Sequence, residues 1–148
     1  MQDRAFQRKA YGGTNLVVSL FLIPTLLLLA NCVTALETQE KAPSEASLKQ
    51  SFAEQIKSSP VVKDFSQNGD DIFFTAGPAK WRVHINKAVV EPKDDEMKPY
   101  KGTIQSVWYK NGNPANEMQI PLAFISAGIG PNCWAFWGKR TKRWNWTE

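Results

Sequence analysis

Residues 80–90, "KWRVHINKAVV", alternate between polar and apolar side chains over their first seven positions. The two parities are Trp81, Val83 and Ile85 against Arg82, His84 and Asn86. Successive side chains of a β-strand point to opposite faces of a sheet, so this alternation indicates a strand with one buried face. The stretch therefore predicts that the folded part of the chain is built mainly on a β-sheet.

Turn signals divide the neighbouring sequence into further strands. Residues 102–112, "GTIQSVWYKNG", end in Asn111-Gly112, a pair that accepts the positive φ angles of a type I′ hairpin turn. Asn68-Gly69 is the same pair of residues earlier in the chain and also predicts a turn. Together these signals predict an antiparallel sheet whose strands follow one another along the chain.

Residues 117–130, "EMQIPLAFISAGIG", are apolar without a clear period. Pro121 lies in the middle of this run, and proline cannot donate a hydrogen bond to a sheet. We expect this segment to form an edge strand or a pair of short strands.

A helix is expected ahead of the strands, over residues 44–58. The apolar residues recur at four-residue spacing and would form one buried stripe: Leu48, Phe52 and Ile56. Ser47 with Gln50 three residues later is a candidate capping box, and Pro60 prevents the helix from continuing.

The chain closes with residues 131–148, "PNCWAFWGKRTKRWNWTE", which hold four of its six tryptophans. If residues 139–142 form the turn of a last hairpin, Trp137 lies opposite Trp144 and Ala135 lies opposite Trp146. Small residues facing large rings suit a closely packed core. One face of the hairpin is therefore predicted to be core: Cys133, Ala135, Trp137, Trp144 and Trp146.

Trp134 and Phe136 have the opposite parity and lie beside the basic turn. They could form an exposed aromatic patch that stacks on sugars or fills a partner's pocket. The candidate binding patch consists of Trp134, Phe136, Lys139, Arg140 and Arg143. The alternative is that a curled sheet, the helix or residues 120–125 cover these rings. A one-residue slip in register would exchange the two faces.

These elements predict an α+β domain over residues 47–148. One N-terminal amphipathic helix would pack on a curved, antiparallel meander of five or six strands. The arrangement is similar to cystatin-like and NTF2-like folds in architecture alone, and the similarity implies no function.

The first 31 residues have the pattern of a secretory signal peptide. A basic n-region at residues 1–15 precedes an uncharged, largely apolar h-region at residues 16–30. Fifteen such residues are fewer than the roughly 20 that a membrane-spanning helix needs. Residues 32–46 are mostly small and polar, the composition of a flexible tether.

Three fates of this signal are consistent with the sequence. Residues 29–32, "LANC", resemble a bacterial lipobox, which would make Cys32 a lipidated first residue, although Asn31 stands where that motif has a small residue. Cleavage after Ala35 also fits, because "VTA" supplies the small residues that signal peptidase requires. The segment could also be kept as an uncleaved anchor.

The sequence argues against an enzyme. His84 is the single histidine and falls on the polar parity of its strand, where a surface role is expected rather than catalysis. No serine lies in a nucleophile elbow, and "DDE" at residues 94–96 lacks the alternating ligands of a calcium loop. We expect no catalytic residue, no metal site and no cofactor.

The net charge and the predicted export signal define the expected class of function. The net charge is +4, and it falls to +2 when residues 1–31, with three cations and one anion, are left out. We expect an exported bacterial cell-envelope protein, periplasmic or membrane-anchored, that binds an envelope protein or an anionic or glycan polymer. Carbohydrate or cell-wall recognition, and inhibition of an envelope-directed hydrolase, are the alternatives. Nucleic acid is not an expected partner outside the cell.

Overall fold

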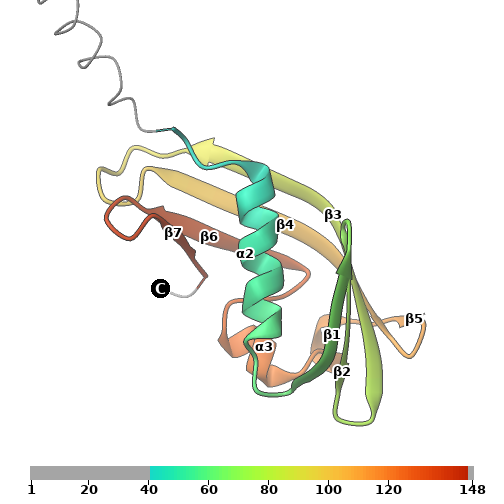
Figure 1. Ribbon diagram of the computed structural model, residues 1–148. Helices are drawn as coiled ribbons and strands as arrows, with labels where there is room; N and C mark the ends of the chain where they lie inside the picture. The colour runs from blue at the N-terminus through green and yellow to red at the C-terminus, as the bar shows by residue number, and fades with distance from the viewer. Residues whose placement is uncertain (1–40, 147–148) are drawn as a thin grey trace, which may run out of the picture. The chain divides into compact units, whose positions relative to one another are not determined.

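The structure, a computed structural model, describes residues 41–146, in which the longest helix packs inside a curled antiparallel sheet (Figure 1). The elements are α2 (Glu45–Lys57), β1 (Val62–Asn68), β2 (Asp71–Ala76), β3 (Ala79–Pro92), β4 (Tyr100–Lys110), β5 (Asn113–Pro114), the 3₁₀ helix η1 (Glu117–Gln119), α3 (Leu122–Ser126), β6 (Asn132–Gly138) and β7 (Arg143–Asn145). Six strands lie in the order β1-β2-β3-β4-β6-β7, and the short β5 pairs with β4. The α+β class and the antiparallel sheet are confirmed. The helix lies at residues 45–57, well inside the chain.

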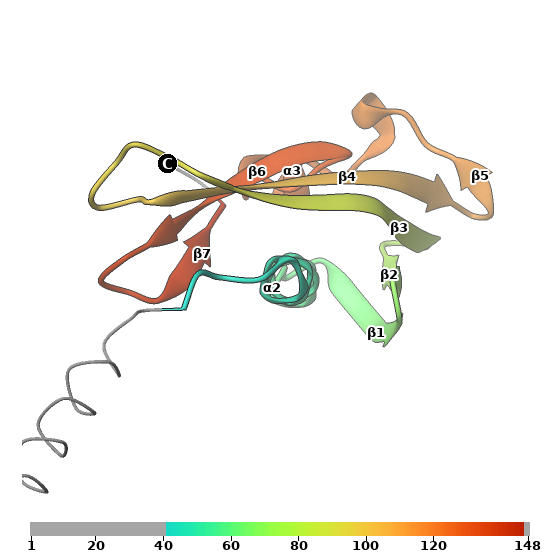
Figure 2. The same ribbon diagram turned by 90° about the horizontal axis from the view of Figure 1, so that it is seen from above.

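The sheet curls around α2, which Figure 2 shows end-on inside the curve. Two irregularities in pairing increase the bend, one between Lys63 and Ser66 and one between Ile85 and Lys87. Such bulges raise the local twist of a strand. We call the face toward α2 the inner face and the opposite face the outer face.

Helix α2 begins one turn earlier than the predicted cap implied. Ser44 is the N-cap residue, and its side chain accepts a hydrogen bond from the backbone N–H of Ser47 over 3.1 Å. The expectation that Ser47 and Gln50 form the capping box is wrong, because Ser47 already lies in the first turn. The apolar stripe is confirmed, since Leu48, Phe52 and Ile56 are fully buried.

Aromatic rings dominate the core on the inner face. Trp108 and Phe124 are each about 1% exposed, and their ring centroids lie 5.4 Å apart. Phe74 contacts both of these rings and stacks on Trp81 at 6.4 Å. The alternation predicted for residues 80–85 is confirmed, because Trp81, like the other apolar residues of its parity, is buried.

The prediction of strands over residues 117–130 is wrong. This segment forms η1 and α3 instead. Asn116 and Gln119 form a reciprocal capping box that starts η1, with side chain to backbone distances of 2.9 and 3.2 Å. Pro121 is the N-cap residue of α3, where a missing N–H costs nothing. Phe124 of α3 is buried in the core.

The last hairpin has the predicted register. Trp137 pairs with Trp144 across β6 and β7, with ring centroids 5.4 Å apart. Trp144 and Trp146 are buried, and Trp137 is half-buried against the core. The turn expected at Asn111-Gly112 is also confirmed, since both residues have positive φ angles.

The signal peptide, Cys32, the cleavage site after Ala35 and residues 32–40 of the tether lie outside the described residues. Within residues 41–146, no helix has the length and apolar character needed to cross a bilayer.

Candidate binding site

Trp134 is the exposed tryptophan of the last hairpin. It lies on the outer face of β6, opposite Thr103 of β4, and 54% of its surface is accessible. Its neighbours Cys133 and Ala135 are buried on the inner face, as the predicted parity requires. The Lys101 ammonium lies 5.5 Å from the centre of the Trp134 ring, within the range of a cation–π contact.

Phe136 shares the parity of Trp134 but is only 9% exposed. The ammonium groups of Lys93 and Lys98 lie 4.3 and 5.3 Å from its ring centre. Both lysines belong to the β3–β4 loop, which is held close by a 3.1 Å hydrogen bond from Lys139 N–H to the Met97 carbonyl. The candidate patch therefore contains one exposed ring and one covered ring.

A groove of about 310 Å³ opens beside Trp134. Its apolar lining comes from the segment before β6, from β6 itself and from the end of β7: Ile125, Ile129, Cys133, Trp134, Phe136 and Trp146. Glu117 and Asn132 add polar atoms. The groove follows the start of β6, where β7 does not reach, because β7 pairs with Phe136 to Gly138 only. A groove of this size accommodates a large side chain or a single sugar ring.

The cations of the predicted patch do not reach this groove. Lys139, Arg140 and Arg143 lie beyond the other end of β6 and are exposed. The structure thus separates the predicted patch into the groove beside Trp134 and a basic loop at the far end of the same strand.

Sequence reasoning missed one wall of the groove. Ile125, Ile129 and Glu117 come from the segment that was expected to be a strand. The spacing of Asn116 and Gln119, together with Pro121 at a helix start, was the signal that could have indicated helical turns there.

Cys133 is a free thiol that lines the groove. Burial raises its pKa to about 11, although a backbone contact from Gly130 acts in the opposite direction. A thiol of this pKa is protonated at neutral pH and is a poor nucleophile. Its role in the groove is therefore that of a small apolar side chain.

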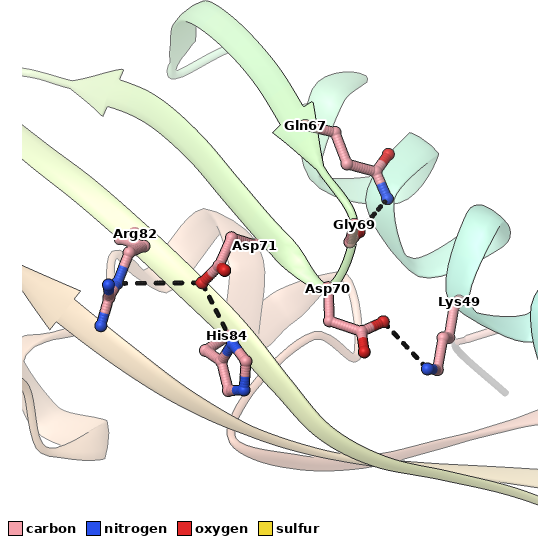
Figure 3. A network of polar contacts seen from close by, with 7 residues as sticks. All are labelled: Lys49, Gln67, Gly69, Asp70, Asp71, Arg82 and His84. Atoms are coloured by element: carbon pink, nitrogen blue, oxygen red, sulfur yellow. Dashed lines mark hydrogen bonds and ion pairs between the residues drawn. The ribbon is translucent and has the colours of Figure 1, made fainter.

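His84 lies in a surface network on the other half of the sheet (Figure 3). Its Nδ1 is 3.0 Å from Asp71 Oδ1, and Arg82 Nε is 3.9 Å from the same oxygen. Nearby, Lys49 pairs with Asp70 at 2.9 Å. The contact of His84 in this network is with the Asp71 carboxylate, which it shares with the Arg82 guanidinium.

No group of three or more His, Cys, Asp or Glu side chains in the described range is placed to hold a metal ion. Comparison of the chain with protein-family models, with curated proteins and with solved structures finds no match.

Proposed function

We propose that this protein is an exported component of a bacterial cell envelope whose domain binds a partner without catalysis, through the groove beside Trp134. One observation carries the proposal: a half-exposed tryptophan forms the wall of an apolar groove. Leaving such a ring in water forgoes several kcal/mol of burial, of the order of 25 cal/mol per Å². Exposed aromatic surface of this kind is typical of binding sites.

A protein partner is favoured by the apolar side chains near the groove. Met118 and Leu122 are 96% and 75% exposed, and they belong to the same segment as Glu117 and Ile125 of the groove wall. Interfaces are enriched in methionine and aromatic residues in their core. A partner that fills the groove and covers these residues would remove most of the apolar exposure on this side.

A glycan is the second candidate. The Trp134 ring can stack on a sugar, while Glu117 and Asn132 supply the polar groups that sugar hydroxyls need. This alternative requires no contact with Met118 or Leu122, which distinguishes it from a protein partner.

The envelope location is part of the proposal and is supported by the sequence. A lipid at Cys32, the first residue of the predicted tether at residues 32–46, would hold the domain close to a membrane. Cleavage after Ala35 would release it. As an architecture, a helix on a curled sheet is again similar to cystatin-like and NTF2-like folds, and the proposal takes no activity from that similarity.

The location is tested by the intact mass of the mature protein from membrane and soluble fractions of a bacterial host. A membrane species that begins at Cys32 and carries acyl chains is the expected result. A soluble species that begins at Leu36 would still indicate export, but without a lipid anchor. An unprocessed cytoplasmic chain would contradict the proposal.

The groove is tested with a photo-crosslinking amino acid placed in living cells at position 132, where the exposed Asn132 lines the groove and Trp134 is kept. Position 73 is the matched control, because Phe73 is 39% exposed on the outer face but does not line the groove. A discrete adduct at position 132 that is absent at 73, and is lost in Trp134→Ala and in Leu122→Ser, is expected. Equal labelling at both positions would contradict a groove-specific partner. Sugar oligomers that quench fluorescence in the wild type but not in Trp134→Ala would instead favour the glycan.

A further inference from the structure

The chain enters the domain at the same end of the sheet as the β6–β7 loop. The first turn of α2 is fixed there by a 3.1 Å hydrogen bond from Trp144 Nε1–H to Ser47 Oγ and by Leu48, which packs against Gly102. Figures 1 and 2 both place the start of α2 near this hairpin. A membrane anchor that precedes residue 41 would therefore be joined to the domain at this end.

The β6–β7 loop and the first residue of β7 are strongly basic. Residues 139–143, "KRTKR", contain four cations and no anion, and all five residues are exposed. Lys139, Arg140 and Arg143 make no ion pair with any residue in the range 41–146. Their charge is therefore directed to the solvent.

The adjacent β3–β4 loop does not cancel this charge. Residues 93–99 hold two lysines and three acidic residues, so this loop and residues 139–143 together still carry a net charge of +3. Asp95 Oδ1 accepts hydrogen bonds from the backbone N–H groups of Met97 and Lys98, both at 2.9 Å, so this carboxylate is held by its own loop. Met97 itself is 54% exposed, and its carbonyl accepts the hydrogen bond from Lys139.

We propose that this end, residues 139–143 together with Met97, docks on a membrane surface of anionic lipid headgroups. The inference rests on the proposed envelope location. Ser44 is twelve positions after Cys32, and twelve fully extended residues span about 40 Å. Basic residues within a Debye length of an anionic leaflet are attracted to it, each by a factor of about five in binding. An exposed apolar side chain among them can enter the headgroup region.

The test uses the mature protein purified from a bacterial host and placed in phosphatidylcholine vesicles with or without phosphatidylglycerol. The rate at which an acylating reagent modifies Lys139 is measured by peptide mass spectrometry, relative to Lys63 and Lys80 at the opposite end. We expect phosphatidylglycerol to slow the modification of Lys139 by about fivefold. About 1 M salt should restore the rate, because it shortens the Debye length to about 3 Å.

Two double variants complete the experiment. Arg140→Glu with Arg143→Glu should abolish the protection of Lys139, whereas Lys57→Glu with Lys87→Glu, which makes the same change in charge away from this end, should retain it. Equal rates in the two kinds of vesicle, or protection that survives in Arg140→Glu with Arg143→Glu, would overturn the proposal.

A protein that is not lipidated gives a result that differs from a basic loop that does not dock. An unlipidated protein stays in the soluble fraction and is then mixed with the same vesicles. Flotation that requires phosphatidylglycerol and is lost in Arg140→Glu with Arg143→Glu would still support docking by the basic loop. Absence of flotation would overturn it.

Discussion

Trp144 and Ser47 are 97 positions apart in the sequence and are joined by a hydrogen bond of 3.1 Å from the indole Nε1–H to the serine Oγ. One turn further along α2, Ser51 Oγ accepts a 3.0 Å hydrogen bond from Trp146 Nε1–H. The end of the described domain, β7 and the residue after it, is thus attached to the first helix by two tryptophans whose rings are buried and whose donors are satisfied. These two hydrogen bonds hold the last edge of the sheet against the helix inside the curl.

Loss of either serine hydroxyl should destabilise the domain. Ser47→Ala and Ser51→Ala each leave a largely buried indole N–H without its acceptor, so we expect each to lower the free energy of unfolding by about 1–2 kcal/mol. Urea denaturation followed by circular dichroism measures the change. Ser66→Ala is the control, because Ser66 is exposed on β1 and should change the stability by less than about 0.5 kcal/mol. Equal stability in all three variants would show that water replaces the serines.

Gly102 is required by close packing. A Cβ atom at this position would lie 2.5 Å from Leu48 Cδ1 and 3.0 Å from Trp144 Cζ3. We expect Gly102→Ala to lower the free energy of unfolding by about 1–3 kcal/mol. Gly130→Ala is the control, since the nearest atom to its Cβ would be 3.5 Å away, an ordinary contact.

The clash at Gly102 can be tested separately from general strand effects. In Gly102→Ala with Leu48→Ala, the space vacated by leucine accommodates the new methyl group, so the double variant should lose less stability than the sum of the single variants. Simple additivity would mean that Leu48 is not the obstacle.

Trp134 and Phe136 should respond differently to truncation, although they share one parity. Phe136 is buried beneath Lys93 and Lys98, so we expect Phe136→Ala to cost about 3 kcal/mol of unfolding free energy. Trp134→Ala should cost less than about 1 kcal/mol, because the ring is 54% exposed, while removing crosslinking and ligand binding. A large loss of stability in Trp134→Ala would indicate a structural ring.

Cys133 should make stability depend on pH in the alkaline range. Its pKa rises from an ordinary value of 9.0 to about 11 through burial. At pH 8 and below, the thiol is largely neutral in both states. Between the two values the unfolded chain releases the proton and the native chain does not, so the free energy of unfolding falls by about 1.4 kcal/mol per pH unit.

Cys133→Ala removes this component and provides the comparison. Urea midpoints of wild type and variant, measured at about pH 8 and about pH 10, should converge as the pH rises. If both proteins lose the same stability between these pH values, groups other than Cys133 cause the alkaline destabilisation.

Local sequence patterns were sufficient for the parts of the fold that are stabilised by near neighbours or by strict periods. The stripe of Leu48, Phe52 and Ile56 predicted the helix, and Asn111-Gly112 predicted a turn with positive φ angles. The spacing around residues 139–142 predicted that Trp137 faces Trp144. In each case the decisive interaction lies within a turn, a helix face or one hairpin.

Only the tertiary structure decided which outer-face ring is available to a partner. Trp134 and Phe136 are equivalent in parity, but the β3–β4 loop, some forty positions earlier in the chain, covers Phe136 alone. The groove likewise depends on a helical segment and on the early end of β7 meeting at one edge of β6. Such contacts join segments distant in sequence, and their geometry follows from the curl of the whole sheet, which no local period encodes.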